Sequence, residues 1–352
     1  MFDKSTWIRL PRNVVVGHDV LDDVGAVVAD THLTGRPLIV TSPTPKRVAA
    51  DPIVDHLEAD GLDPALTTVE TASFDAVETV LAEARMTDVG FLVGVGGGKA
   101  IDIAKMAADE LGVGFISVPT AASHDGIVSG RGSVPEGDSR HSVAADPPVA
   151  VLADTGIIAD APWELTTAGC ADIISNYTAV KDWRLAERLR NVEYSEYAGA
   201  LSQMTAEMLV DNAGSIKPGL EESAWVVVKA LVSSGVAMSI AGSSRPASGA
   251  EHLFSHQLDR IAPDAALHGH QVGVGAIVIE YLHSGESGDW RSVRDALASI
   301  DAPTTASELG VDPGAIVEAL ATAHRIRDRY TILGSGISDA AAREAATKTG
   351  VI

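Results

Sequence analysis

Three polar residues in the C-terminal half of the 352-residue chain, Asp172, His252 and His268, are of the types that bind a transition metal. Asp172 lies in the apolar segment Ala168–Asn176, where a buried carboxylate is costly unless it is paired or bound to a metal. One carboxylate and two imidazoles are ligands that zinc accepts at a catalytic site with an open position. His252 and His256 share one helical face, as residues of an ordinary polar helix surface also do. The residues alone therefore indicate a zinc site and leave a polar surface as the alternative.

A glycine-rich turn in the N-terminal half has the composition of a phosphate-binding loop. The segment Phe91–Asp102 runs from an apolar strand through Gly96, Gly97 and Gly98 into a helix. Backbone N–H groups and a helix N-terminus can approach a pyrophosphate there, because no Cβ stands in the way and the helix dipole favours negative charge. The spacing is neither G-x-G-x-x-G nor the P-loop pattern. A dinucleotide site is the functional interpretation, and a tight turn without a ligand is the alternative.

Two neighbouring segments bear on the cofactor. Pro119–Gly126 follows the next strand, so its hydroxyl groups should face the same crevice at the carboxyl ends of the strands. The strand Pro37–Ser42 ends in hydroxyls rather than the acidic residue that often holds a free ribose 2′-hydroxyl. Lys46 and Arg47 follow within reach of a 2′-phosphate. These two residues therefore allow NADP as well as NAD as the cofactor. Alternatively, they are solvated cations of the surface.

The elements that must position these loops alternate between strand and helix patterns over about the first 150 residues, which predicts a parallel sheet covered by helices. The segments with helical periodicity include Phe74–Ala84 and Ala100–Leu111. The polar segment Gly130–Pro148 predicts a hairpin that leaves the sheet. The predicted strands are Asn13–Val16, Pro37–Ser42, Ala65–Val69, Phe91–Val95, Phe115–Pro119 and Ala150–Ala153.

After Pro162, which can occupy the first turn of a helix, the sequence shows only helical periodicity. We therefore expect an α/β N-terminal domain of the Rossmann-like, doubly wound type in residues 1–160 and an all-α domain in residues 161–352. The cleft between the two is the expected ligand site.

Composition limits the partners and the compartment. The formal net charge of −22 disfavours nucleic acid and anionic membranes, and it predicts a salt-rich cytoplasm in which self-repulsion is screened. An ordinary acidic protein is the alternative. The single Cys170 excludes an intrachain disulfide, and Met1–Leu10 carries charges without an apolar signal segment. The apolar stretches Trp225–Ile240 and Val272–Leu282 contain polar or charged residues, so no membrane span is expected.

Five motifs in order over nearly the whole chain resemble the sn-glycerol-1-phosphate dehydrogenase family, which belongs to the iron-containing alcohol dehydrogenase and dehydroquinate synthase superfamily. The segment Ser244–His252 is far more specific than any glycine loop. The motifs are Gly96–Lys99, Pro119–Gly126, Ala168–Asn176 followed by Asp182 and Trp183, Ser244–His252, and His268–Gly273.

The resemblance implies a role for each matching residue. Asp172, His252 and His268 would bind the metal. Asp125, Asp172 and His256 would contact the substrate and take part in catalysis. The cofactor would contact Gly96, Gly97, Gly98, Lys99, Ala100, Thr120, Ala121, Ala122, Ser123 and Ser129.

One position departs from the wider superfamily. Many iron-containing alcohol dehydrogenases carry a histidine four residues after the aspartate, where this chain has Asn176, and that difference favours zinc over iron. The reaction implied is reduction of dihydroxyacetone phosphate by NADH or NADPH to sn-glycerol-1-phosphate, by a homo-oligomer in the cytoplasm. A polyol dehydrogenase of the same superfamily and a dehydroquinate synthase-like lyase, whose first metal ligand is typically glutamate, are the alternatives.

The resemblance leaves the proton donor and the phosphate-binding residues open. Zinc-bound water, His256 and a relay through Asp125 are the candidate donors, of which His256 is preferred because its reference pKa lies near neutrality. The substrate phosphate requires local positive charge in a strongly acidic chain. The sequence offers three candidates for this charge: Lys229, Arg245 and the helix start near His268.

Overall fold

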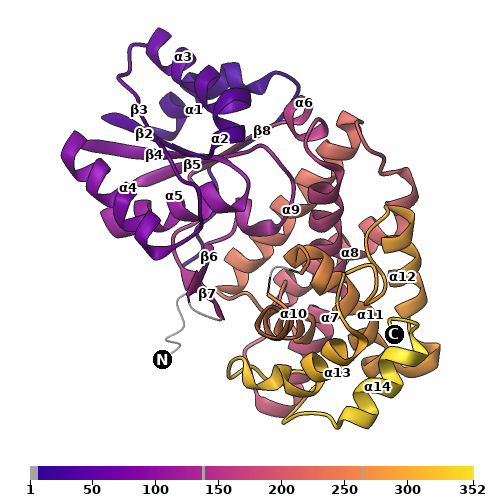
Figure 1. Ribbon diagram of the computed structural model, residues 1–352. Coiled ribbons are helices and arrows are strands. Elements are labelled where there is room, and N and C mark those ends of the chain that lie inside the picture. Colours follow the sequence, from indigo (N-terminus) through magenta and orange to yellow (C-terminus); the bar gives the residue numbers. More distant parts are fainter. Residues whose placement is uncertain (1–6, 137–138, 264) are drawn as a thin grey trace.

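Six parallel strands form the central sheet of the N-terminal part (Figure 1). This computed structural model describes residues 7–136, 139–263 and 265–352. Along the sheet the strand order is β1-β8-β5-β4-β2-β3, and every neighbouring pair is parallel. The strands are β1 (Asn13–Gly17), β2 (Arg36–Thr41), β3 (Ala65–Thr68), β4 (Val89–Gly96), β5 (Gly114–Pro119) and β8 (Ala150–Asp154).

Helices cover both faces of this sheet, because its strands carry apolar side chains on both sides. In β2, Ile39 packs in the cluster that contains residues of α1 and α3, whereas Leu38 and Val40 pack in the cluster that contains residues of α4 and α5. The predicted strands are confirmed to within two residues at either end. The covering helices are α1 (Val24–Thr31), α3 (Asp51–Ala59), α4 (Phe74–Thr87) and α5 (Gly98–Leu111), and the short helix α2 (Pro43–Pro45) follows β2.

The order of the strands reverses at the glycine-rich turn. From β2 the chain continues outward to β3, whereas from β4 it continues in the opposite direction to β5. Gly96 at the end of β4 pairs in register with Pro119 at the end of β5. The loops that follow these two strands therefore lie side by side at one edge of the sheet, where a doubly wound fold binds its ligand.

A two-stranded hairpin leaves the sheet between β5 and β8, as the sequence predicts. Strands β6 (Arg131–Glu136) and β7 (Ser139–Ala144) pair antiparallel, β6 packs on α5, and β7 reaches α10 of the helical part. Residues 1–6, 137–138 and 264 lie outside the described residues. The prediction that Met1–Leu10 is not a signal segment therefore falls mostly outside them.

The described chain after β8 contains helices and loops, which confirms an α/β part followed by an all-α part; a boundary at residue 160 stays a prediction. Helices α7 and α11 pack most extensively on each other. Figure 1 shows the helical part, coloured magenta to yellow, beside the carboxyl edge of the sheet. The helices are α6 (Thr155–Ala159), α7 (Trp163–Arg190), α8 (Glu196–Asn212), α9 (Glu221–Ala241), α10 (Ala250–Ile261), α11 (His268–Ser284), α12 (Trp290–Ser299), α13 (Pro313–Thr322) and α14 (Asp339–Lys348).

Helix α9 is long and apolar enough to cross a membrane, whereas the sequence predicts no span there. Half of its most apolar 18-residue window is buried inside the protein, and the helix packs against α6, α7 and α8. A core helix of a globular fold can be equally long and apolar, and the packing of α9 is of that kind.

Candidate active site

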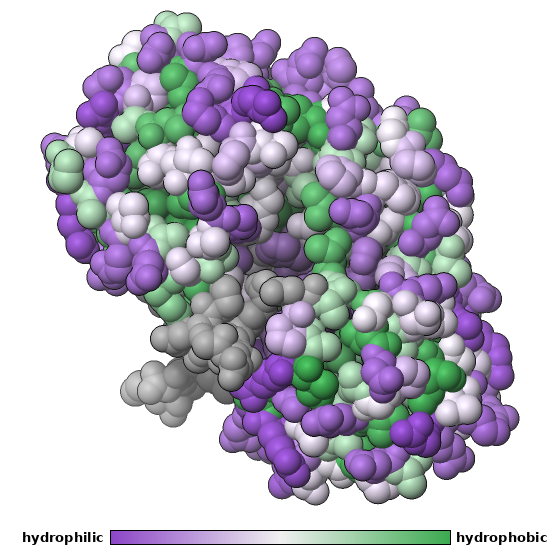
Figure 2. Space-filling model, viewed as in Figure 1, coloured by the Kyte–Doolittle hydropathy of each residue, from purple (hydrophilic) through white to green (hydrophobic). Residues whose placement is uncertain are grey.

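A cavity of about 330 Å³ lies between the α/β part and the helical part. Its walls come from the loops after β4 and β5, from strand β6, and from helices α7, α9, α10 and α11. Figure 2 shows the surface hollowed between the two parts. A cleft of this kind, with polar groups from both sides, is the usual place for a small ligand.

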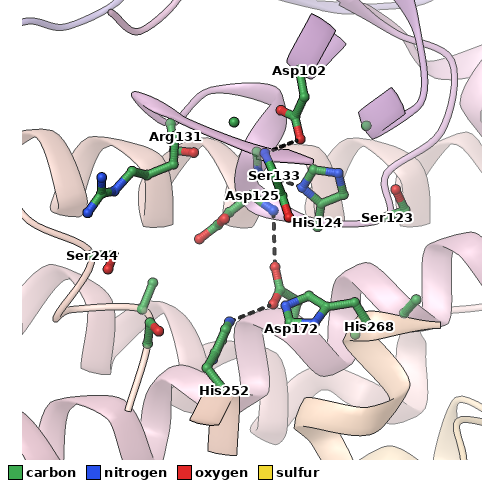
Figure 3. Close-up of a pocket in the computed structure, with 18 of the residues that line it drawn as sticks. Asp102, Ser123, His124, Asp125, Arg131, Ser133, Asp172, Ser244, His252 and His268 are labelled. Atoms are coloured by element: carbon green, nitrogen blue, oxygen red, sulfur yellow. Dashed lines mark hydrogen bonds and ion pairs between the residues drawn. The ribbon is translucent and has the colours of Figure 1, made fainter. Parts of the chain in front are cut away.

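The three predicted metal ligands converge on the helical wall of this cavity. One ligand atom from each of Asp172, His252 and His268 lies within 4.8 Å of the others, although the residues belong to three different helices. The Nε2 atom of His252 lies 3.6 Å from Oδ1 of Asp172, and the rings of His252 and His268 are 5.1 Å apart. Figure 3 shows the three side chains pointing toward one another.

Hydrogen bonds behind the cluster orient the imidazole rings. The Nδ1 atom of His252 lies 3.0 Å from Oε1 of the fully buried Glu251, and the other oxygen of Glu251 accepts from the hydroxyl of Thr178 at 2.8 Å. The Nδ1 atom of His268 lies 2.9 Å from the hydroxyl of Ser255. Metal-binding histidines characteristically use their second nitrogen in this way, which fixes the ring and its tautomer.

The charges of this cluster fit a divalent cation. Burial alone would lower the pKa of His252, but the neighbouring Asp172 and Glu251 raise it to about 9. The imidazole thus carries a proton that balances two carboxylates. A divalent cation can take the place of that proton, since the donor set of one carboxylate and two imidazoles is one that zinc accepts.

Asp125 lies on the opposite wall, facing the cluster. Its backbone N–H donates to Oδ2 of Asp172 at 3.1 Å, and its carboxylate accepts from the hydroxyl of Ser234 at 2.8 Å. The amide of Asn176 donates in turn to Ser234 at 3.1 Å. Burial and then the charge of Asp172 raise the pKa of Asp125 to about 7. The carboxyl group can therefore hold or release a proton near neutral pH.

His256 is placed as the sequence predicts, one helical turn beyond His252 and on the cavity wall. Its ring stacks on that of His268, with 5.6 Å between the ring centres and 20° between the planes. The position is close enough to the cluster for a proton-transfer role or for a hydrogen bond to the substrate.

The glycine loop has the backbone geometry of a nucleotide cradle. Gly96 has φ +145°, a value that side chains rarely allow, and Gly97 caps the 14-residue helix α5. A Cβ on Gly94 would come within 2.9 Å of Ala104, so the helix packs closely on the strand. A phosphate can therefore reach the N-terminus of α5, where the N–H groups and the helix dipole favour an anion.

The predicted cofactor residues divide into two groups. Four of them line the cavity: Gly98, Lys99, Ser123 and Ser129. The other six belong to the segments Gly96–Ala100 and Thr120–Ser123 but do not line it: Gly96, Gly97, Ala100, Thr120, Ala121 and Ala122. Of the two cations considered for a 2′-phosphate, Lys46 already pairs with Asp51 at 2.5 Å.

Six further polar residues of the cavity have no role in the predictions from sequence, although most lie in segments that the sequence singles out. They are Asp102 in α5, His124 in the Pro119–Gly126 motif, Ser244 and Ser248 in the Ser244–His252 motif, Arg131 at the start of the hairpin, and Arg327 in a loop near the C-terminus. Of the guesses for phosphate binding, Lys229 does not line the cavity, and its ammonium group lies 3.9 Å from the centre of the Trp225 ring. Arg245 does not line it either, although its neighbour Ser244 does.

A family model described as "Iron-containing alcohol dehydrogenase" matches residues 15–162. With this match, the fold and the site define a nucleotide-dependent dehydrogenase of the iron-containing alcohol dehydrogenase class. The chain is 78% identical over 352 residues to a Halobacterium salinarum protein named glycerol-1-phosphate dehydrogenase (NAD(P)+), with 100% of both chains covered. The chain belongs to the glycerol-1-phosphate dehydrogenase family.

Two further comparisons agree with this assignment. A Natronomonas pharaonis protein of the same name is 75% identical over 352 residues and is also covered completely. Among solved structures, a probable glycerol dehydrogenase from Sinorhizobium meliloti has a TM-score of 0.81 at 20% sequence identity, with 98% of both chains covered. The second likeness shows the fold alone.

Proposed function

We propose that this enzyme reduces dihydroxyacetone phosphate with NADH or NADPH to sn-glycerol-1-phosphate, for glycerophospholipids of the archaeal type. The observation that carries the proposal is the full-length 78% identity to a protein named for this activity. The convergence of Asp172, His252 and His268 beside the nucleotide loop supports it, because those groups suit the reduction of a ketone.

We propose zinc as the resident metal. The cluster offers one carboxylate and two imidazoles, and Asn176, which stands where many relatives in the superfamily have a further histidine, is engaged with Ser234. The donor set leaves a position for the substrate. When bound, zinc would supply a Lewis acid for the ketone oxygen, and the nicotinamide would supply the hydride.

The side chains of the cavity have three tasks in this reaction. Gly98, Lys99, Ser123 and Ser129 bind the cofactor along the carboxyl edge of the sheet. Asp172, His252 and His268 hold the metal. A proton must reach the product oxygen, and His256 is our preferred donor, with Asp125 as a relay, because both groups line the cavity beside Asp172.

The decisive experiment follows NADH and NADPH oxidation by the purified enzyme in high salt, with dihydroxyacetone phosphate and with unphosphorylated dihydroxyacetone. We expect much faster turnover of the phosphate ester, stoichiometric consumption of the reduced cofactor, and the sn-1 enantiomer on chiral analysis. Equal rates would favour a polyol dehydrogenase. Catalytic rather than stoichiometric use of the cofactor would favour a lyase.

The setting of the enzyme is also a proposal. We place it in the cytoplasm as a homo-oligomer. Exposed apolar side chains on α8 and α9, namely Tyr197, Met204, Met208 and Trp225, support association with a second copy. Light scattering in high salt measures the oligomeric state directly.

A further inference from the structure

Four arginines gather at one side of the active-site cavity, in a chain whose net charge is −22. Arg131 and Arg327 line the cavity themselves. Arg329 donates to the hydroxyl of Ser244 at 2.9 Å, and Ser244 also lines the cavity. Arg245 is the fourth member, because its charge acts on both Arg327 and Arg329. Positive charge is thus concentrated beside the site in a protein that is acidic elsewhere.

The four side chains lack close carboxylate partners. Within the described part of the chain, none of them forms an ion pair with an Asp or Glu at 4.0 Å or less. Arg327 donates to the hydroxyl of Ser248 at 2.7 Å, but its buried Nε has no hydrogen-bond partner among the described residues. The charge of Glu251 acts on this arginine, but Glu251 is already bonded to His252 and to the Gly249 N–H.

The electrostatics agree with this geometry. Burial, followed by the charge of Arg131, lowers the pKa of Arg327 to about 10. Burial, followed by the charge of Arg327, lowers the pKa of Arg329 to about 8. Partly buried like charges that form no direct ion pair are costly, so their retention beside a cavity indicates a site built to receive an anion.

Arg131 and Arg327 line the same cavity as the metal cluster. Ser248, the partner of Arg327, lies in the loop just before α10, the helix that carries His252. The backbone carbonyl of Arg131 accepts a hydrogen bond from the buried Lys105 at 2.5 Å, which anchors the start of β6. In Figure 3 the Arg131 side chain extends toward the region of Ser244, on the side of the cavity away from His268.

We propose that Arg131 and Arg327, together with the hydroxyls of Ser244 and Ser248, bind the phosphate group of the substrate. Arg245 and Arg329 stand behind them and strengthen the positive field. The inference rests on the proposed function, which supplies a phosphorylated ketone as the ligand. A three-carbon substrate held there by its phosphate presents its carbonyl toward the adjacent cluster of Asp172, His252 and His268.

The chemistry of arginine suits the conditions that the net charge implies. At about 1 M salt the screening length falls to roughly 3 Å, so a distant positive field attracts a phosphate weakly. Recognition then depends on direct contacts. A guanidinium group offers a planar fork of donors that matches phosphate oxygens, whereas a lysine offers only a point charge.

The test measures Arg131→Gln and Arg327→Gln in steady-state kinetics at high salt. We expect KM for dihydroxyacetone phosphate to rise at least about tenfold, since a hydrogen bond to a charged group is lost. KM for NADH should stay within about twofold, and the preference for dihydroxyacetone phosphate over unphosphorylated dihydroxyacetone should fall. Arg327→Lys should recover part of the loss. Arg343→Gln, an exposed arginine of α14, is the matched control and should behave as the wild type.

Calorimetry with inorganic phosphate gives a readout that does not depend on turnover. We expect the enzyme without cofactor to bind phosphate, and both Gln variants to lose that binding while circular dichroism stays the same. Unchanged KM for dihydroxyacetone phosphate in both variants would overturn the inference and leave the proposed function standing. A raised KM for NADH alone would also overturn it, because the arginines would then serve the cofactor. A wild-type enzyme without preference for the phosphate ester would remove the proposed function itself.

Discussion

Asp172 and Glu251 occupy neighbouring buried positions around one imidazole, and this pairing explains much of the chemistry of the site. Two buried carboxylates repel each other, so each needs a positive partner or hydrogen bonds. Asp172 accepts from the Asp125 N–H, and Glu251 accepts from Thr178 and His252. The remaining lone pairs of Asp172 face the cavity. A cation at this point removes the repulsion and is held by the same groups.

The substitution Asp172→Asn tests the ligand assignment. The neutral amide loses the charge that attracts a divalent cation, so we expect metal content near zero and loss of activity, with far-UV circular dichroism retained. Elemental analysis of the purified variant measures the metal. His268→Ala should give the same result. Asp211→Asn, an exposed carboxylate on α8, serves as the control, and a variant of Asp172 that kept full turnover would refute the assignment.

The substitution Glu251→Gln separates the orienting partner from the ligands. Glu251 does not belong to the ligand cluster but holds the Nδ1 atom of His252. Loss of such an outer partner weakens metal affinity by about 10- to 100-fold. Competition with a chromogenic chelator measures the change. The exposed Glu222→Gln on α9 is the matched control, and equal zinc affinity in the two variants would show that Glu251 has no orienting role.

For single residues, the sequence predicts the metal ligands better than it predicts the side chains around them. The motifs around Asp172, His252 and His268 carry a family resemblance, and the structure brings those residues together. Arg327 carries no such signal, because it lies in a short polar segment after α13 that resembles an ordinary surface loop. Its place in the cavity depends on how the C-terminal helices pack, which no local spacing expresses.

Helices α7 and α11 set the position of the metal cluster through contacts between backbones. An added Cβ at Gly269 would lie 2.0 Å from the carbonyl oxygen of Ala168, so the two helices touch at that glycine. Asp172 lies one turn beyond Ala168, and His268 directly precedes Gly269. A Cβ at Gly169 would lie 1.9 Å from the carbonyl of Ala122, which brings α7 against the loop that carries Asp125. Small residues at two crossings therefore assemble the site.

Gly269→Ala should separate α7 from α11 and disturb the metal site as well as the fold. A backbone oxygen cannot move aside as a side chain can, so we expect a loss of about 1–3 kcal/mol in the free energy of unfolding. Weaker zinc affinity should accompany it. Denaturant unfolding in high salt measures the first effect and chelator competition the second. Gly214→Ala, where an added Cβ meets nothing within 4 Å, is the control. A Gly269→Ala variant as stable as the wild type would contradict the close contact of α7 and α11 at this glycine.

The elements themselves follow closely from the sequence, but their assembly does not. Each predicted strand is a short β-branched run between helical segments, and β4 and β5 fall within two residues of the prediction. The hairpin Arg131–Ala144 follows from its glycine and proline punctuation. The crossing of α7 and α11 at Gly269 depends on complementary surfaces of two buried helices. Such helices show little periodic contrast, because almost every side of them is covered.

On the scale of the whole molecule, the charge distribution is uneven. The chain has 48 acidic and 26 basic residues, yet Arg131 and Arg327 line the cavity and Arg329 bonds to Ser244 of its wall. The remaining surface is therefore even more acidic than the net charge suggests. Its relatives in Halobacterium salinarum and Natronomonas pharaonis match it over the full length, which agrees with the salt-rich setting inferred from composition.

Dialysis of the enzyme into low salt should unfold it. Repulsion among the surface carboxylates acts over a Debye length of about 30 Å at 0.01 M salt but only about 3 Å at 1 M. The exposed ion pairs, such as Lys348 with Glu286, contribute too little to offset that repulsion. We expect helicity and activity to fall together as salt is removed, with circular dichroism and NADH oxidation measured on the same samples.

Charge-neutralising variants separate repulsion from other effects of salt. Glu78, Glu222 and Glu344 are exposed and belong to three different helices, so replacing them with Gln lowers the repulsion without altering the cavity. The salt concentration at half-unfolding should fall in the triple variant, whereas Arg343→Gln, which removes a positive charge from the same kind of surface, should raise it. Since both changes leave the buried apolar core intact, a salting-out effect on that core would give no such opposite shifts. An unchanged midpoint in both variants, or a native enzyme at 0.01 M salt, would show that surface charge does not control the stability.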